Sequence, residues 1–143
     1  MSLSLLREFC AENFTDVPAA IEAGADRIEL CDNLAVGGTT PSAGVIGAAT
    51  VYAHEHGARV MTMIRPRGGD FVYGPVELQM MQSDIETACR LGTDGIVFGC
   101  LERREHGFWL DLSAIETLVA RVRWMQDQRD WSGVPREFDR EDQ

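Results

Sequence analysis

Short apolar runs recur along the chain at nearly even intervals, and each follows a glycine by two or three residues. The glycines are Gly24, Gly57 and Gly92, and the runs after them are RIELC, RVMTMI and GIVFGC. Runs of β-branched and apolar residues are typical of buried strands, and a glycine in this place is typical of a helix C-terminus. The repeating unit is therefore predicted to be helix, glycine, strand.

The pattern predicts four strands and four helices that alternate, with no fifth strand. Some helical repeats have a similar period, but their units consist of two helices, whereas these runs are typical of strands. Alternation of this kind builds a parallel α/β sheet, either doubly wound or closed into a barrel. The strands are expected at about 5–10, 27–31, 59–64 and 95–100, and the helices at about 15–23, 42–56, 75–92 and from 111 or 113 onward.

The character of the sequence changes after about Met125, where the residues become polar, acidic and aperiodic. We expect a domain over residues 1–125 and a disordered tail over residues 126–143. A closed β/α barrel takes about 250 residues. The chain is therefore predicted to be a parallel (β/α) TIM-barrel type fold that is truncated to about four β/α units.

The charge and the cysteine content of the sequence exclude several classes of partner and of metal or redox site. Thirteen basic and 23 acidic side chains give a formal charge of −10, which argues against nucleic acid or an anionic membrane as the main partner. The amino terminus lacks a leader pattern and no window is long and apolar enough to span a membrane, so a soluble cytoplasmic protein is expected. The four cysteines form no C-x-x-C pair, which leaves neither a zinc ribbon nor a redox motif.

Polar side chains share one face of the predicted strands. Because side chains alternate along a strand, Glu8 and Cys10 lie on one face of the first strand, and Glu29 and Cys31 on one face of the second. The active sites of β/α barrels lie at the carboxyl ends of the strands. We expect these four side chains to converge there.

The third strand leads into the loop Arg65-Pro66-Arg67-Gly68-Gly69-Asp70, which we take as the centre of the working face. Two carboxylates would then face two guanidinium groups. These pairs could be structural, because buried carboxylates need partners. Alternatively, Arg65 and Arg67 bind an anionic ligand with the Gly68 and Gly69 amides, while Glu8 or Glu29 moves a proton.

Two further features each allow two interpretations. The loop from Gly37 and Gly38 to Ser42 leads into a helix, whose free amides favour phosphate, but we prefer the interpretation as an ordinary turn with Ser42 as N-cap. Cys10 and Cys31 could together bind a soft ion such as Cu(I), with Met61 or Met63 nearby. Buried cysteines also serve as small hydrophobic residues.

Three long motifs, GADRIELCDNLAVGGTTPS, MIRPRGGDFVY and GIVFGCL, resemble the CutC family, which is named for copper homeostasis. The resemblance covers about residues 5–120. It implies a β/α barrel, a cytoplasmic location and a role in handling copper, with Cys10 and Cys31 at the positions of the family's suggested copper ligands. The matching positions are Glu8, Cys10, Glu29, Cys31, Arg65, Arg67, Gly68, Gly69 and Asp70.

The family continues into further strands that this sequence does not match. Three hypotheses follow: a CutC-type copper-binding protein, a barrel enzyme of unknown reaction acting on a small anionic, for example phosphorylated, metabolite, or a non-functional fragment of a longer barrel. Open edges at the first and fourth strands favour self-association, so a homo-oligomer or a poorly soluble monomer is expected.

Overall fold

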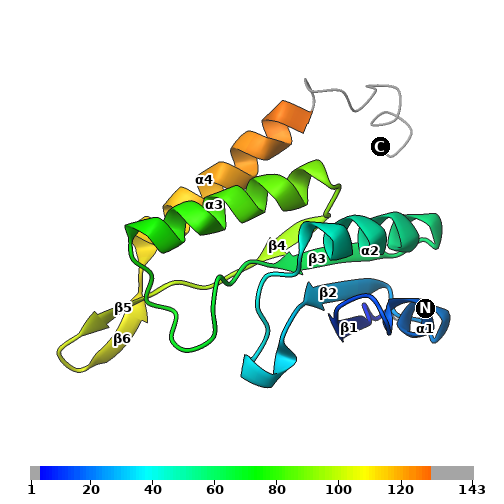
Figure 1. The fold of residues 1–143 in the computed structure, drawn as a ribbon, viewed down its shortest axis with the longest axis horizontal. Coiled ribbons are helices and arrows are strands. Elements are labelled where there is room, and N and C mark those ends of the chain that lie inside the picture. The colour runs from blue at the N-terminus through cyan, green and yellow to red at the C-terminus, as the bar shows by residue number, and fades with distance from the viewer. Residues whose placement is uncertain (1–3, 130–143) are drawn as a thin grey trace.

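The computed structural model of this protein describes residues 4–129 of the 143-residue chain. Strands and helices alternate as far as the fourth strand, and a hairpin and a long helix follow (Figure 1). The elements are β1 Glu8–Glu12, α1 Val17–Glu22, β2 Arg27–Cys31, the 3-10 turn η1 Leu34–Val36, α2 Ala43–Glu55, β3 Arg59–Met63, α3 Pro75–Arg90, β4 Gly95–Val97, β5 Leu101–Arg104, β6 Gly107–Leu110 and α4 Leu112–Arg129.

The first four strands form one parallel sheet in the order β1-β2-β3-β4. Glu8 pairs with Arg27 and Arg27 with Arg59, so the first three strands begin at the same level. β4 begins further along, where Gly95 pairs with Met61. Helices cross between these parallel strands as β/α units require, which confirms the predicted α/β class.

Helices cover one face of this sheet (Figure 1). Ile28, Leu30 and Val60 of the strands are fully buried in one cluster with Ile46 and Ala53 of α2. A second cluster joins α3 to α4 and the end of the sheet, and its buried members are Ile64, Tyr73, Met81, Ile85, Cys100, Ala114 and Leu118. Apolar burial of this kind is the main source of the fold's stability.

Residues that alternate with this core lie on the opposite face of the sheet. Glu29 and Met61, for example, are neighbours in the register of β2 and β3, and both are only partly buried. In a closed barrel this face would line the interior. This open face carries the predicted site residues of β1 and β2, Glu8, Cys10, Glu29 and Cys31.

The three punctuating glycines end helices, as predicted. Gly24, Gly57 and Gly92 directly follow the C-cap residues of α1, α2 and α3, and their φ angles are +111°, +74° and +95°. A residue with positive φ in this position closes a helix, and glycine adopts that conformation without a Cβ clash.

The first strand lies further along the chain than predicted. β1 is Glu8–Glu12, because β2 begins at Arg27 and its pairing partner there is Glu8. Leu5 and Leu6 precede the ladder and are 76% and 61% exposed. Pairing at the other end extends instead to Glu12, opposite Cys31. Glu8 is therefore at the amino end of its strand, not at the mouth.

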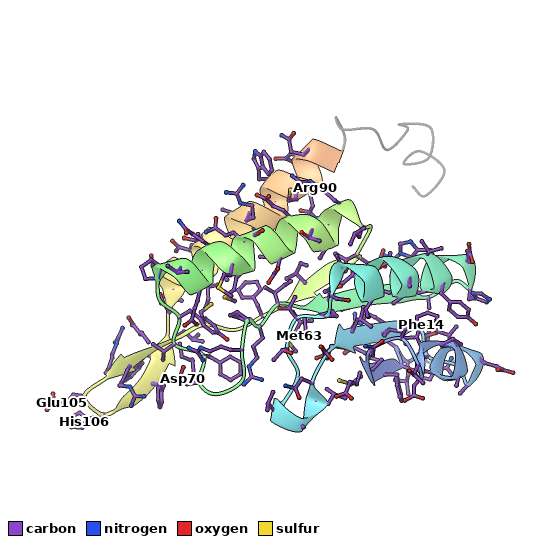
Figure 2. The ribbon with its side chains drawn as sticks, in the orientation of Figure 1. Phe14, Met63, Asp70, Arg90, Glu105 and His106 are labelled. Carbon is purple, nitrogen blue, oxygen red and sulfur yellow. The ribbon has the colours of Figure 1, made fainter. Side chains whose placement is uncertain are left out.

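The antiparallel hairpin of β5 and β6 was not predicted. Arg103 pairs with Phe108 and Arg104 with Gly107 in the register. The guanidinium carbon of Arg103 lies 4.7 Å from the centroid of the Phe108 ring, and that of Arg104 lies 5.0 Å from the centroid of the Trp109 ring. Such cation–π contacts stabilise a strand pair that has no alternating apolar pattern. Figure 2 shows Glu105 and His106 at the tip of this hairpin.

The last helix also differs from the prediction. α4 continues to Arg129, so residues 126–129 are helical and do not belong to a disordered tail. The rest of the predicted tail, residues 130–143, lies outside the described residues. Among the helices of residues 4–129, none combines the length and the apolar content that crossing a membrane requires.

Candidate metal-binding site

Two thiols and a carboxylate meet on the open face of β1 and β2. In the parallel register Cys10 pairs with Glu29, and Cys31 follows two residues later on the same face. The Cys10 and Cys31 sulfur atoms lie 3.9 Å apart, and the Cys31 sulfur lies 3.9 Å from Oε1 of Glu29. The three ligand atoms all lie within 4.8 Å of one another, which is close enough for one metal ion to contact all three.

The two thiols differ in their surroundings. Cys10 is exposed, whereas Cys31 is fully buried. Burial, followed by the neighbouring Cys10 and Glu29, raises the pKa of the Cys31 thiol to about 12. Burial and the nearby Glu8 carboxylate raise the pKa of Glu29. Without a cation the group therefore retains protons that a bound metal would displace.

The structure contradicts the expected pairing of Glu8 and Glu29 with Arg65 and Arg67. Glu8 forms an ion pair with Arg27, its direct neighbour in the β1–β2 register. Arg67 lies beyond the end of β3 and contacts Asp70, with a nitrogen–oxygen distance of 3.2 Å. Because its side chain extends toward the first turn of α3, its second partner is Glu77, at 3.1 Å.

Arg65 connects two loops. Its Nη1 donates to the carbonyl oxygens of Val36 and Gly38 at 2.6 and 2.9 Å, and its Nη2 donates to that of Gly69 at 2.8 Å. The main-chain amide of Arg65 donates a hydrogen bond to the Thr40 hydroxyl oxygen at 2.8 Å, and the Thr40 hydroxyl donates to the Arg65 carbonyl oxygen at 3.1 Å. Arg65 thus holds the loop after β2 against the loop after β3.

Asp70 helps to close the loop in which it lies. Its Oδ1 accepts from the amide of Val72 at 3.1 Å and from Arg67, and these two contacts lower the pKa of the Asp70 carboxyl, the Val72 bond contributing most. Its other oxygen lies 4.0 Å from Arg103 of β5. Figure 2 accordingly shows Asp70 near the base of the hairpin.

The candidate glycines line narrow spaces between loops. A Cβ atom at Gly38 would lie 3.3 Å from the Cys31 sulfur, and one at Gly68 would lie 3.1 Å from Val36. Gly37 and Gly69 have positive φ angles of +93° and +87°. Of these four glycines, Gly38 is the one whose added Cβ atom would contact the thiol site.

The turn interpretation of Ser42 is confirmed, since its hydroxyl oxygen accepts from the amide of Val45 at 3.2 Å as the N-cap of α2.

Sequence analysis missed Glu12 and Tyr73. Glu12 has the same strand parity as Glu8 and Cys10, and this parity was a signal that could have identified it. Its Oε2 accepts from the amide of Leu34 at 2.6 Å and so anchors the 3-10 turn η1 beside the thiols. Tyr73 belongs to the second core cluster, and it is the last residue of the motif MIRPRGGDFVY, which was a signal that could have identified it.

Comparisons with known proteins point to one family. The model of the CutC family matches residues 5–125. A CutC family protein of Enterococcus faecalis is 57% identical over 122 residues, which are 85% of this chain and 57% of that protein. A human protein named copper homeostasis protein cutC homolog is 46% identical over 101 residues, which are 71% of this chain and 36% of that protein.

A solved structure shows the same fold. The crystal structure of CutC from Streptococcus agalactiae superposes with a TM-score of 0.78 at 51% sequence identity, covering 84% of this chain and 56% of that one. The sheet is therefore part of a TIM-barrel type fold, as predicted. This chain spans little more than half the length of these bacterial relatives. On the family match and on these identities, the chain belongs to the CutC family.

Proposed function

We propose that this chain is a CutC-type copper homeostasis protein that binds Cu(I) through Cys10 and Cys31, with Glu29 beside them. The observation that carries the proposal is the 3.9 Å distance between the two sulfur atoms on one face of the sheet. Thiolates are the ligands that Cu(I) prefers, and the register of β1 and β2 brings these two together without rearrangement of the backbone.

Binding has to displace protons, because thiolates and not thiols coordinate metals. The pKa of Cys31, raised to about 12 by burial first, leaves that thiol protonated at neutral pH. A cation bound at the site would lower the pKa of Cys31 again, because its positive charge stabilises the thiolate that burial disfavours. Copper uptake by this chain should therefore release protons. A cytoplasmic location fits free thiols, which a reducing compartment preserves.

The test is an anaerobic Cu(I) titration of the purified chain against a colorimetric Cu(I) chelator. We expect stoichiometric binding that C10S and C31S each weaken by at least about tenfold, since even the loss of an outer-shell partner costs that much. C89S is the matched control, because Cys89 lies on α3, outside the thiol site. If both site variants bind Cu(I) like the parent, the proposal is wrong.

A second candidate is a barrel enzyme that acts on a small anionic metabolite. Arg65 is the observation that favours it, because this residue is 6% exposed and forms no ion pair within residues 4–129. Glu29, with its raised pKa, is the candidate acid or base. A survey of anions as stabilisers tests this function independently of copper.

We also propose that the chain associates with a second copy through its open sheet. Within the described residues β1 pairs only with β2, and β4 only with β3. Phe9, on the first strand, is 40% exposed, and it lines an apolar groove of about 450 Å³ along α1. A parallel edge strand with apolar side chains is a template for pairing. Sedimentation should show dimers, and a monodisperse monomer that melts cooperatively would contradict the proposal.

A further inference from the structure

Arg65 is a buried charge without a countercharge. It is the one charged residue among the buried residues of the described chain, at 6% exposure. Buried charges are normally paired, because the transfer of an unpaired ion out of water is costly. Asp70 of the same loop and Glu77 of α3 both pair with Arg67, and no ion pair within residues 4–129 includes Arg65. The fold thus leaves one positive charge in need of an anion.

The hydrogen bonds of Arg65 point to the same need. A guanidinium has five N–H donors. Three of them donate to the carbonyl oxygens of Val36, Gly38 and Gly69, which leaves the Nε hydrogen and one hydrogen on Nη2. The Nε atom is buried and has no hydrogen-bond partner among the described residues. A buried donor without an acceptor has lost its hydration without compensation, which destabilises the fold.

Tyr73 supplies a second donor of the same kind. The residue is 8% exposed, and its hydroxyl is buried and lacks a hydrogen-bond partner within residues 4–129. Arg65 lies close enough to act on it, because burial raises the pKa of Tyr73 and the charge of the Arg65 guanidinium opposes this shift. The Arg67 guanidinium carbon lies 5.2 Å from the centroid of the Tyr73 ring. The hydroxyl therefore sits in a positive environment.

We propose that Arg65 and Tyr73 form a binding site for a small oxyanion, a carboxylate or phosphate group that accepts hydrogen bonds from the Arg65 Nε and from the Tyr73 hydroxyl. Such a group would supply both the missing negative charge and the missing acceptors. The site deepens the second candidate function by naming its ligand class. It also replaces part of the predicted clamp, since Tyr73 takes the place of Arg67.

Access to the site involves Phe71. The Arg65 guanidinium carbon lies 4.8 Å from the centroid of the Phe71 ring, and Phe71 is itself 37% exposed. The Nε atom is closed to solvent, so an incoming anion has to displace a neighbouring side chain. Phe71 is the side chain to move, because its exposed ring lies over the guanidinium. The ring partly compensates the charge of Arg65 while no anion is bound.

The experiment measures thermal unfolding of the full chain in inorganic phosphate, in acetate and in chloride at equal ionic strength. We expect phosphate or acetate at millimolar concentrations to raise the melting temperature above that in chloride. Protection by phosphate alone indicates a phosphate ligand, and protection by acetate indicates a carboxylate. Absence of protection by either anion overturns the proposal.

The variant Y73F decides the role of the hydroxyl. It should weaken the apparent anion affinity by at least about tenfold, because one hydrogen bond to a charged group is lost. The matched control is Y52F, which removes a hydroxyl on α2. If Y73F retains full anion protection, the hydroxyl is simply unsatisfied and the proposal fails.

R65K keeps the positive charge but removes the guanidinium Nε donor, so its anion affinity should fall while the chain still folds. Cu(I) binding by Y73F should equal that of the parent, so failure of the anion site and failure of the copper site are separable.

Discussion

Gly38 lies directly against Cys31, so that a Cβ atom at residue 38 would stand 3.3 Å from the sulfur and 3.4 Å from the Cβ of the cysteine. The Gly38 φ of +96° is also one that other residues rarely adopt. Arg65 holds this turn in place through the Gly38 carbonyl. The turn therefore forms a wall of the thiol site, and its position determines the room around the Cys31 sulfur.

The substitution G38A should weaken both the fold and the Cu(I) site. Alanine at positive φ costs about 1–2 kcal/mol, and the new methyl group presses on the Cys31 sulfur. We expect a lower urea midpoint and a weaker Cu(I) affinity. Chemical unfolding and Cu(I) titration measure the two effects.

The matched control for G38A is G57A. Gly57 also has a positive φ, +74°, but a Cβ atom added there would meet no other group within 4 Å. The variant G57A should therefore lose stability as G38A does, but keep the Cu(I) affinity of the parent. Equal copper affinities for G38A and the parent would show that the turn does not shape the metal site.

The cysteines should differ in their reaction with iodoacetamide. Cys10 is exposed, whereas Cys31 and Cys100 are buried and burial raises their pKa values to about 12 and about 11. Thiolates, not thiols, react with alkylating agents. At pH 8 we expect Cys10 to be modified well before the other two, and all three to react in denaturant. Peptide mass spectrometry gives the order, and equal rates for Cys10 and Cys31 in the native chain would contradict the described burial.

Features that depend on neighbours in sequence could be predicted. RIELC forms β2 at the predicted bounds, because its apolar residues and the glycine before it are local signals. The alternation of side chains along β1 and β2 likewise placed Cys10, Glu29 and Cys31 on one face. The convergence of these three side chains is therefore encoded in the pattern itself.

Features that depend on register or on loop packing could not be predicted. Glu8 pairs with Arg27 because the two strands begin together, and no spacing along the chain shows this. Arg65 is buried because carbonyl groups of two separate loops surround its guanidinium, although arginine is normally exposed. The hairpin was not predicted because its first strand has a single apolar residue, Leu101, and the two arginines of that strand contact aromatic rings of the other strand.

Thr93 should be more important for stability than Thr62. Their hydroxyl oxygens lie 2.8 Å apart in the core, and that of Thr93 also lies 3.1 Å from the Val60 carbonyl oxygen and 3.0 Å from that of Gly95. T93V leaves the fully buried Thr62 hydroxyl without this partner and should cost about 1–3 kcal/mol. T62V leaves Thr93 its carbonyl acceptors and should cost about 0.5–1.5 kcal/mol. Urea unfolding measures both, and a larger loss for T62V would contradict the assignment.

Asp84 should destabilise the folded chain at neutral pH. It lines a cavity of about 350 Å³ beside Ser42, and no ion pair within residues 4–129 includes it. Burial raises the pKa of its carboxyl. A carboxyl whose pKa is higher in the folded than in the unfolded chain disfavours folding above that pKa, and this effect vanishes below its ordinary value of about 3.9.

The variant D84N should therefore be more stable than the parent at pH 7, and its advantage should shrink as the pH falls through the raised pKa toward 4. D26N is the matched control, because it removes the same charge from a carboxyl whose pKa is lowered, chiefly by hydrogen bonds from Arg7. Stability from such a group is present at neutral pH and is lost on acidification, so D26N should be less stable than the parent at pH 7, with a difference that also closes below pH 4. Urea unfolding at several pH values gives both curves. Since both variants change the net charge equally, opposite signs at pH 7 can come only from the local surroundings of the two carboxyls, and equal signs would show that the overall negative charge dominates.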